Sequence, residues 1–125
     1  MQPEGYSTVS PYLVVDNAQT IVEFLQKVFG GVQKNRQENP DGSIIHVEVA
    51  IGDTLIMMGD SGEGNPAFPS WLHVYVDNVD ETYRQALNEG AKSVQEPVQQ
   101  EGDLDKRGGV MDSSGNTWWI ATRIE

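Results

Sequence analysis

The stretch Val15-Asp16-Asn17-Ala18 decides the fold, because it is nearly repeated later in the chain as Val76-Asp77-Asn78-Val79. Apolar residues follow each copy at helical spacing, so each copy marks the end of a strand and the start of a helix. Asn17 and Asn78 are predicted N-caps, since an asparagine side chain accepts a hydrogen bond from the first helical turn. The helices are predicted to end at Gly30-Gly31 and at Gly90. The sequence therefore contains two diverged copies of one unit.

Three strands are predicted after each helix. The turn Gly52-Asp53 in the first copy matches Gly115-Asn116 in the second, and each precedes the last strand of its copy. The order is thus β-α-β-β-β twice, which predicts one α+β domain over residues 1–125. Module one spans about 7–59, a Gly- and Pro-rich linker about 60–69, and module two about 70–123. The strands after the helices are predicted at 32–37, 43–51 and 54–58, and at 93–99, 108–111 and 117–123.

Charge and composition exclude several classes of protein. The net charge of −11 argues against nucleic-acid binding, because phosphate backbones are bound by clusters of Lys and Arg. No apolar run approaches the roughly 18–20 residues that span a bilayer, and the N-terminus lacks the features of a signal peptide, so we expect no membrane association and a cytoplasmic location. Without cysteine there is no disulfide and no thiolate site. The acidic field either attracts cationic ligands or only keeps the protein soluble.

Strand alternation assigns side chains to the two faces of the predicted sheet. In 43–51, the side chains of Ile45, Val47, Val49 and Ile51 are expected beneath a helix. The opposite face combines large aromatic rings with two histidines and a carboxylate, which is typical of a ligand pocket. The alternative is that these rings pack against a second subunit or the facing half of the sheet. The residues expected on this face are Tyr12, His46, Glu48, Trp71, His73, Tyr75 and Trp119.

The segment Asp103–Gly109 is predicted to be a flexible loop over the mouth of the cavity. Its Arg107 is a candidate contact for an anionic ligand.

Four stretches resemble the glyoxalase/bleomycin-resistance/dioxygenase superfamily, also called vicinal oxygen chelate proteins. They are Ser10–Asn17 with Phe29-Gly30-Gly31, His46–Asp53, Leu72–Asp80 and the closing strand Asp112–Thr122. Together they resemble the branch described as phosphonate-operon or demethylubiquinone-methyltransferase-like. The resemblance implies that the modules form a curved mixed sheet with the helices on its convex side. It also implies a homodimer, for which Phe68, Trp118 and the Gly59–Ser70 loop are candidate contacts.

Metal-dependent members of this superfamily hold a divalent ion through His and Glu. The matching positions here are Ser10, Ile56, Trp71 and Trp119, and none is a normal metal ligand. No cofactor is therefore favoured. The alternative is a displaced set of His46, Glu48 and His73 that binds Ni, Zn, Mn or Fe, or an acid/base pair without metal.

Three functions remain open from the sequence. The first is a metal-independent protein that binds a small aromatic or cationic ligand with Tyr12, Trp71, Tyr75, Trp119 and Arg107. The second is a lyase, isomerase or dioxygenase-like enzyme that uses His46, Glu48 and His73. The third is an accessory or degenerate member of the superfamily whose ligand is unknown.

Overall fold

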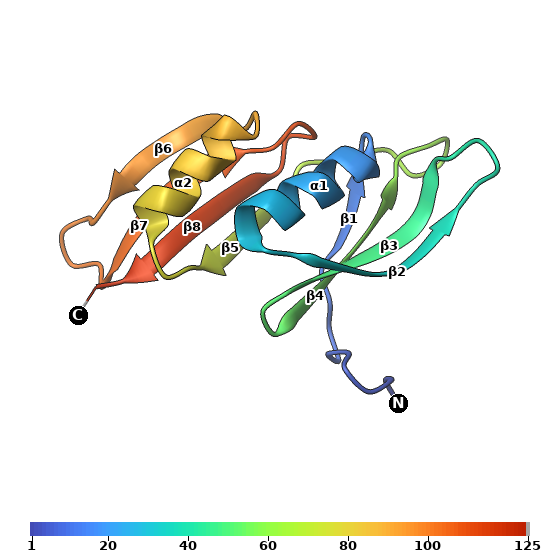
Figure 1. Cartoon of the computed structure of the whole chain (residues 1–125), viewed down its shortest axis with the longest axis horizontal. Helices are drawn as coiled ribbons and strands as arrows, with labels where there is room; N and C mark the ends of the chain where they lie inside the picture. Colours follow the sequence, from blue (N-terminus) through green and yellow to red (C-terminus); the bar gives the residue numbers. More distant parts are fainter. Residues whose placement is uncertain (125) are drawn as a thin grey trace. The chain divides into compact units, whose positions relative to one another are not determined.

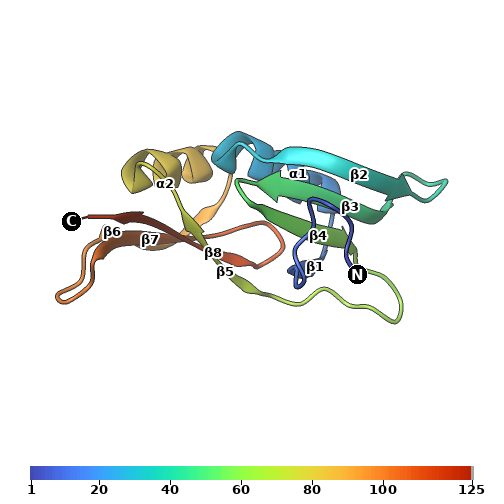
Figure 2. The ribbon, with the colours of Figure 1, turned by 90° about the horizontal axis from the view of Figure 1, so that it is seen from below.

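The computed structural model describes residues 1–124 and contains two compact units, Met1–Phe68 and a second that begins at Pro69. We call them module one and module two. Each contains one helix and one four-stranded mixed sheet, with the helix lying over one face of its own sheet (Figure 1; Figure 2). This arrangement confirms the predicted α+β class and the order β-α-β-β-β in each copy.

Module one has the strand order β1-β4-β3-β2, with β1 parallel to β4 and the other pairs antiparallel. The turn Gly52-Asp53 joins β3 to β4 as predicted, and Gly52 takes the left-handed φ of 57° that this tight turn requires. The elements are β1 (Tyr12–Val15), α1 (Ala18–Phe29), β2 (Val32–Glu38), β3 (Ile44–Ile51) and β4 (Thr54–Asp60).

Module two repeats this topology with the order β5-β8-β7-β6. Its parallel pair is β5 with β8, and its other pairs are antiparallel. The elements are β5 (Trp71–Tyr75), α2 (Val79–Asn88), β6 (Lys92–Val98), β7 (Asp105–Met111) and β8 (Thr117–Arg123).

Both helices begin where the repeat predicted. The side chain of Asn17 accepts a hydrogen bond from the Thr20 amide, and that of Asn78 accepts one from the Glu81 amide at 3.1 Å. Helix α1 then ends at Gly30 in a left-handed conformation. Neither helix in the described part of the chain has the length and apolar character of a bilayer-spanning segment.

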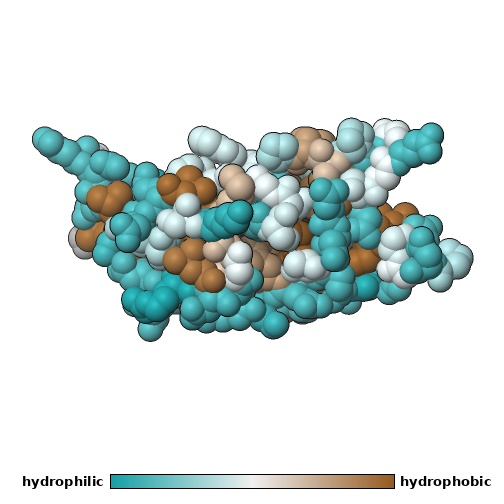
Figure 3. Space-filling view, turned by 90° about the horizontal axis from the view of Figure 1, so that it is seen from above, coloured by the Kyte–Doolittle hydropathy of each residue, from teal (hydrophilic) through white to brown (hydrophobic). Residues whose placement is uncertain are grey.

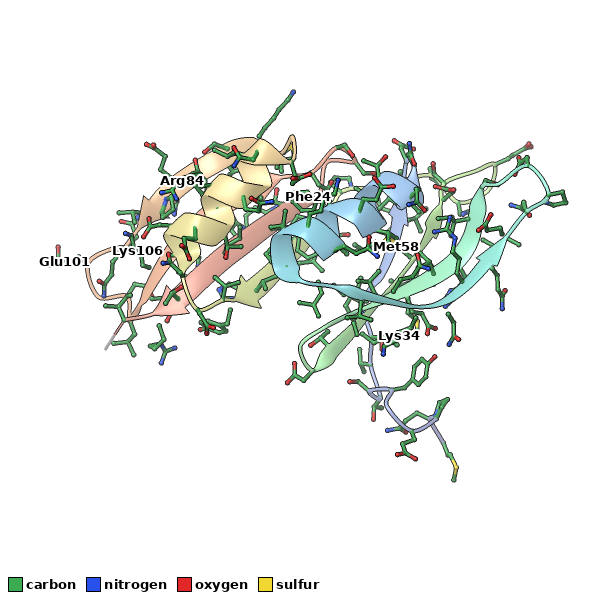
Figure 4. All side chains as sticks on the ribbon, viewed as in Figure 1. Phe24, Lys34, Met58, Arg84, Glu101 and Lys106 are labelled. Carbon is green, nitrogen blue, oxygen red and sulfur yellow. The ribbon has the colours of Figure 1, made fainter. Side chains whose placement is uncertain are left out.

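The apolar face of each helix covers the apolar face of its sheet. In module one, Phe24 on α1 and Met58 on β4, both labelled in Figure 4, are buried together with Leu13 and Val47. In module two, α2 itself buries only Val79 and Ala86, so the core there depends on large strand residues. These are Val110, Trp118 and Ile120. Figure 3 shows a surface that is mainly hydrophilic, interrupted by smaller hydrophobic areas.

Strand β3 departs from the predicted alternation at its start. Val47 and Val49 are buried as expected, but Ile45 is half exposed. The pairing of β3 with β2 shifts between Gln37 and Glu38, which leaves Ile45 without a partner residue across the ladder. Such a bulge breaks the period of two, so the prediction that Ile45 lies beneath the helix was wrong.

The closing turn of module two is built around the buried carboxylate of Asp112. Its Oδ1 accepts from the amides of Ser114 and Asn116, and its Oδ2 accepts from the Trp118 indole N–H at 2.8 Å and the Asn116 side chain at 3.2 Å. Asn116 in turn accepts from the amide of Ser70, which ties the turn to the start of β5. Trp118 is completely buried, so the prediction that it contacts a second subunit was wrong.

Replacing Asp112 by alanine should lower the free energy of unfolding by about 2–5 kcal/mol, because the buried donors of Asn116 and Trp118 lose their acceptor. Urea denaturation followed by tryptophan fluorescence measures this loss. The neighbouring Ser113→Ala is the matched control, since Ser113 is exposed, and it should stay within about 0.5 kcal/mol of the parent. An Asp112→Ala protein as stable as Ser113→Ala would contradict this account of the turn.

Candidate functional site

Each module places its predicted site residues on the face of its sheet opposite its helix. In module one these are Tyr12, His46 and Glu48, and in module two Trp71, His73, Tyr75 and Trp119. We call Tyr6, Asn35, His46 and Glu48 the polar cluster, and Trp71, His73, Tyr75 and Trp119 the aromatic face.

The polar cluster is centred on the buried carboxylate of Glu48. Its Oε1 accepts from the Tyr6 hydroxyl at 2.6 Å and from the Asn35 amide nitrogen at 3.1 Å. Its Oε2 lies 2.8 Å from Nε2 of His46, the residue two positions earlier on β3. The Tyr12 ring lies beside the His46 imidazole, with ring centroids 5.7 Å apart. The predicted pairing of His46 with Glu48 is therefore present, with two further partners.

Sequence reasoning missed Tyr6 and Asn35. The pairing of β2 with β3 shifts between Gln33 and Arg36, so β2 carries one residue more than β3 across this step. This bulge lies opposite Glu48 and brings the Asn35 side chain to its carboxylate. Tyr6 belongs to the irregular segment before β1, which has no periodic pattern. Its contact with Glu48, 42 residues later in the chain, could therefore not be predicted.

Hydrogen bonding keeps Glu48 ionised despite its burial. Desolvation by itself would raise the pKa of Glu48, but the hydrogen bonds from Tyr6, His46 and Asn35 outweigh it and lower the pKa. The same contact with Glu48 raises the pKa of Tyr6, so that hydroxyl stays a donor. An ionised carboxylate only accepts hydrogen bonds, so Nε2 of His46 carries a proton and donates it.

The aromatic face leaves large rings in solvent. Trp71 is 75% exposed and Tyr75 is 58% exposed. The Trp71 and Trp119 rings meet edge to face with centroids 5.3 Å apart, and the His73 and Tyr75 rings do so at 4.9 Å. His73 on β5 is in register with Trp119 on β8. The three rings of β5 therefore lie beside the Trp119 ring of the neighbouring strand. All four predicted residues of this module thus lie together.

The Trp119 ring lies against a glycine. A Cβ added at Gly109, its register partner on β7, would come within 2.6 Å of the indole ring. The missing side chain therefore makes room for the ring. The indole Nε1 of Trp119 is also the one buried side-chain nitrogen or oxygen in residues 1–124 that has no hydrogen-bond partner.

Arg107 is held at the edge of the aromatic face. Its Nε donates to Nε2 of His73 at 3.1 Å, and its terminal nitrogens donate to Asp103 at 2.5 Å and to Asp105 at 2.9 Å. Because two carboxylates already engage the guanidinium, its predicted role as a contact for an anionic ligand has little support from this geometry.

Asp103–Gly109 is not a flexible loop, because β7 begins at Asp105 rather than at the predicted Gly108. The buried Asp105 carboxylate accepts from Arg107, from the Tyr75 hydroxyl at 2.7 Å and from Arg123 on β8 at 2.5 Å. These bonds lower the pKa of Asp105. The pairing of β7 with β8 accordingly begins three residues before the predicted Gly108. Sequence reasoning missed this network, since charged residues beside two glycines suggested a loop.

The folded structure favours the neutral form of His73, because it lowers the pKa of the imidazole. Partial desolvation of the exposed ring, followed by the nearby charge of Arg107, lowers the pKa of its imidazole, although Asp103 and Asp105 act in the opposite direction. The hydrogen bond from Arg107 also favours the neutral imidazole, because it occupies the lone pair of Nε2 that a second proton would need.

The four positions that the resemblance matched to metal ligands do not suit a metal in this chain. Ser10 precedes β1, and Trp71 and Trp119 offer indole rings instead of donor atoms. Ile56 is buried on the helix side, in register with Val49. Ile56 and Trp119, which the resemblance matched to each other, therefore lie on different faces of their sheets. Met57 lies on the face of β4 opposite the helix, where it pairs with Glu48 and Tyr12.

The alternative metal set of His46, Glu48 and His73 draws on both modules. Both oxygens of Glu48 and Nε2 of His73 already take part in hydrogen bonds. Among residues 1–124, no three His, Asp or Glu side chains are gathered in an arrangement that could hold a metal ion.

Comparisons with known proteins agree on one group. The family model described as Glyoxalase/Bleomycin resistance protein/Dioxygenase superfamily matches residues 7–120. The uncharacterized protein Mb0911c of Mycobacterium bovis is 32% identical over 127 residues, which cover 93% of this chain and 83% of that protein.

Solved structures share the fold. TioX from Micromonospora sp. ML1 superposes with a TM-score of 0.78 at 23% identity, covering 94% of this chain and 99% of TioX. A putative 3-demethylubiquinone-9 3-methyltransferase, the PhnB protein from Bacillus cereus, superposes with a TM-score of 0.71 at 14% identity, covering 93% and 99%.

Protonation of His73 should destabilise the fold. The unfolded imidazole titrates near pH 6.5, about its unperturbed value. Because the pKa of His73 is lower than this in the folded state, the unfolded chain binds more protons just below that pH, and the free energy of unfolding falls as the pH decreases. We expect His73→Gln to make this fall shallower, since a glutamine oxygen can still accept from Arg107.

Urea denaturation at pH 7.5 and 5.5 measures the effect. His46→Gln provides the background without the second histidine, and the His46→Gln/His73→Gln double variant isolates the contribution of His73. An equal or steeper loss of stability in the double variant would show that His73 is not held neutral by the fold.

Proposed function

Because the chain belongs to the glyoxalase/bleomycin resistance protein/dioxygenase superfamily, we propose that it binds a small aromatic molecule on the aromatic face of module two, without a metal. The observation that carries this proposal is the exposure of Trp71 and Tyr75 beside Trp119. Such rings stabilise a complex by burying a large apolar area and by stacking on another ring. The net charge of −11 favours cationic aromatic ligands over anionic ones.

The absence of usable donors at the family's metal positions supports binding without an ion. Trp71 and Trp119 stand at two of those positions and are themselves part of the aromatic face. Trp71 and Trp119 thus stand where metal ligands would be needed and provide rings for stacking instead. Membership of the phosphonate-operon branch stays a prediction, because likeness to the Bacillus cereus protein at 14% identity supports the fold alone.

Tryptophan indole N–H signals in ¹H–¹⁵N NMR spectra test this function directly. Titration with the cation N-methylquinolinium should shift the signals of Trp71 and Trp119 and leave that of Trp118 unchanged, since Trp118 is buried on the helix side. Trp71→Ala should weaken binding about tenfold, because it removes one stacking ring. Equal shifts of all three indoles, or unchanged affinity in Trp71→Ala, would overturn the proposal.

Two controls sharpen this experiment. Gly109→Ala should displace the Trp119 ring and weaken binding, whereas Gly62→Ala, at a position with open space, should not.

Dilution without ligand tests the predicted homodimer, in which a second copy covers the face. Indole shifts that change with protein concentration would identify that copy as the occupant instead.

The polar cluster favours a second candidate function, proton transfer. Glu48 fixes Nε2 of His46 as the donor, so whenever the imidazole carries one proton its Nδ1 has a free lone pair. A base oriented in this way can remove a proton from carbon next to a carbonyl group. This function uses two of the three residues predicted for an enzyme.

Exchange of solvent deuterium into dihydroxyacetone, followed by ¹H NMR, measures such proton abstraction. We expect His46→Gln and Glu48→Gln to lower the exchange rate about 100-fold or more, as for removal of a general base or its orienting partner. His73→Gln tests the third predicted residue and should leave the rate unchanged. Exchange no faster than in buffer, or equal rates in all variants, would remove the enzyme assignment.

A further inference from the structure

The contact between Arg107 and His73 fixes which nitrogen of the imidazole carries the proton. The guanidinium nitrogen Nε of Arg107 has only a hydrogen to offer, so it must donate. Nε2 of His73, 3.1 Å away, must therefore accept and carry no proton. The neutral ring then has its proton on Nδ1. His73 thus presents one N–H donor on the aromatic face.

The ring that carries this donor is exposed and held in place. His73 is exposed, its ring meets that of Tyr75, and it lies in register with Trp119. Among residues 1–124, no group accepts a hydrogen bond from Nδ1 of His73. Arg107 cannot turn away freely, because Asp103 and Asp105 bind its terminal nitrogens.

We propose that the ligand of the aromatic face carries a neutral oxygen acceptor, a carbonyl or hydroxyl conjugated to its aromatic ring, which accepts the Nδ1–H of His73. This inference rests on the proposed binding function and narrows its ligand class. The two carboxylates beside Arg107 and the net charge of −11 disfavour a carboxylate or phosphate in that position. Arg107 acts as a positioning residue, since it sets the tautomer of His73 without contacting the ligand.

Two isosteric probes test the acceptor. 2-Acetylnaphthalene has a carbonyl oxygen where 2-isopropenylnaphthalene has a CH₂ group, and the two ring systems are otherwise alike. Titrations followed at the Trp71 and Trp119 indole signals should give about three- to tenfold tighter binding of the ketone, the range of one neutral hydrogen bond. His73→Phe keeps a flat ring without the donor, so it should weaken only the ketone and make the affinities equal.

The tautomer is a separate readout for Arg107. In the parent protein, ¹⁵N shifts of His73 should show a protonated Nδ1 and an unprotonated Nε2. Arg107→Met should mix the tautomers and reduce the preference for the ketone. The Trp118 indole signal reports whether each variant remains folded, since its bond to Asp112 is buried.

The outcomes separate the two proposals. If both probes bind equally to the parent protein and Trp71→Ala weakens both, the aromatic face binds ligands but the acceptor inference is wrong. If neither probe shifts the indole signals but N-methylquinolinium does, the aromatic face binds ligands and only the acceptor inference is wrong. If none of the three compounds shifts them, both proposals fail. A ketone preference that survives His73→Phe also overturns the inference, because another donor must then supply the bond.

Discussion

The carboxylate of Asp112 sets the arrangement on which the rest of module two depends. By binding the Trp118 indole and the Asn116 amide from inside the closing turn, it fixes which of two adjacent tryptophans enters the core. Trp119 must then lie on the opposite face, because neighbouring side chains of a strand alternate. Register with β5 brings it beside His73 and Trp71. A single buried carboxylate thus determines both the core and the surface offered to a ligand.

Much of this fold could be predicted because its signals are local. Asn17 and Asn78 cap their helices, and Gly52 lies in the turn between β3 and β4, each within a few residues of the pattern that predicted it. Alternation also placed His46, Glu48, His73 and Trp119 correctly. The wrong predictions come from strand bulges, which a strict alternation of side chains does not take into account. The bulges of β2 and β3 moved Ile45 out of the core and brought Asn35 to Glu48.

Other features depended on contacts distant in sequence. Tyr6 reaches Glu48 from an irregular segment, and Asp105 starts β7 early because Arg123 and Tyr75 lie on two other strands. The two modules have also diverged in chemistry while keeping one topology. In module one, hydrogen-bond donors surround the buried carboxylate of Glu48. In module two, exposed aromatic rings lie beside His73, whose neutral form is favoured by the hydrogen bond from Arg107. Divergence of this kind gives one fold two surfaces with different chemical capabilities.

Gly109 has an evolutionary consequence. The indole of Trp119 occupies the volume that any side chain at Gly109 would need, so neither position can change independently. A sequence that gains a side chain at the glycine must lose the large ring, and a sequence that loses the ring leaves a hollow that a side chain at the glycine can fill. Among relatives of this chain, the two positions should therefore vary as a pair, and the residue opposite the ring becomes a marker for whether the stacking surface is present.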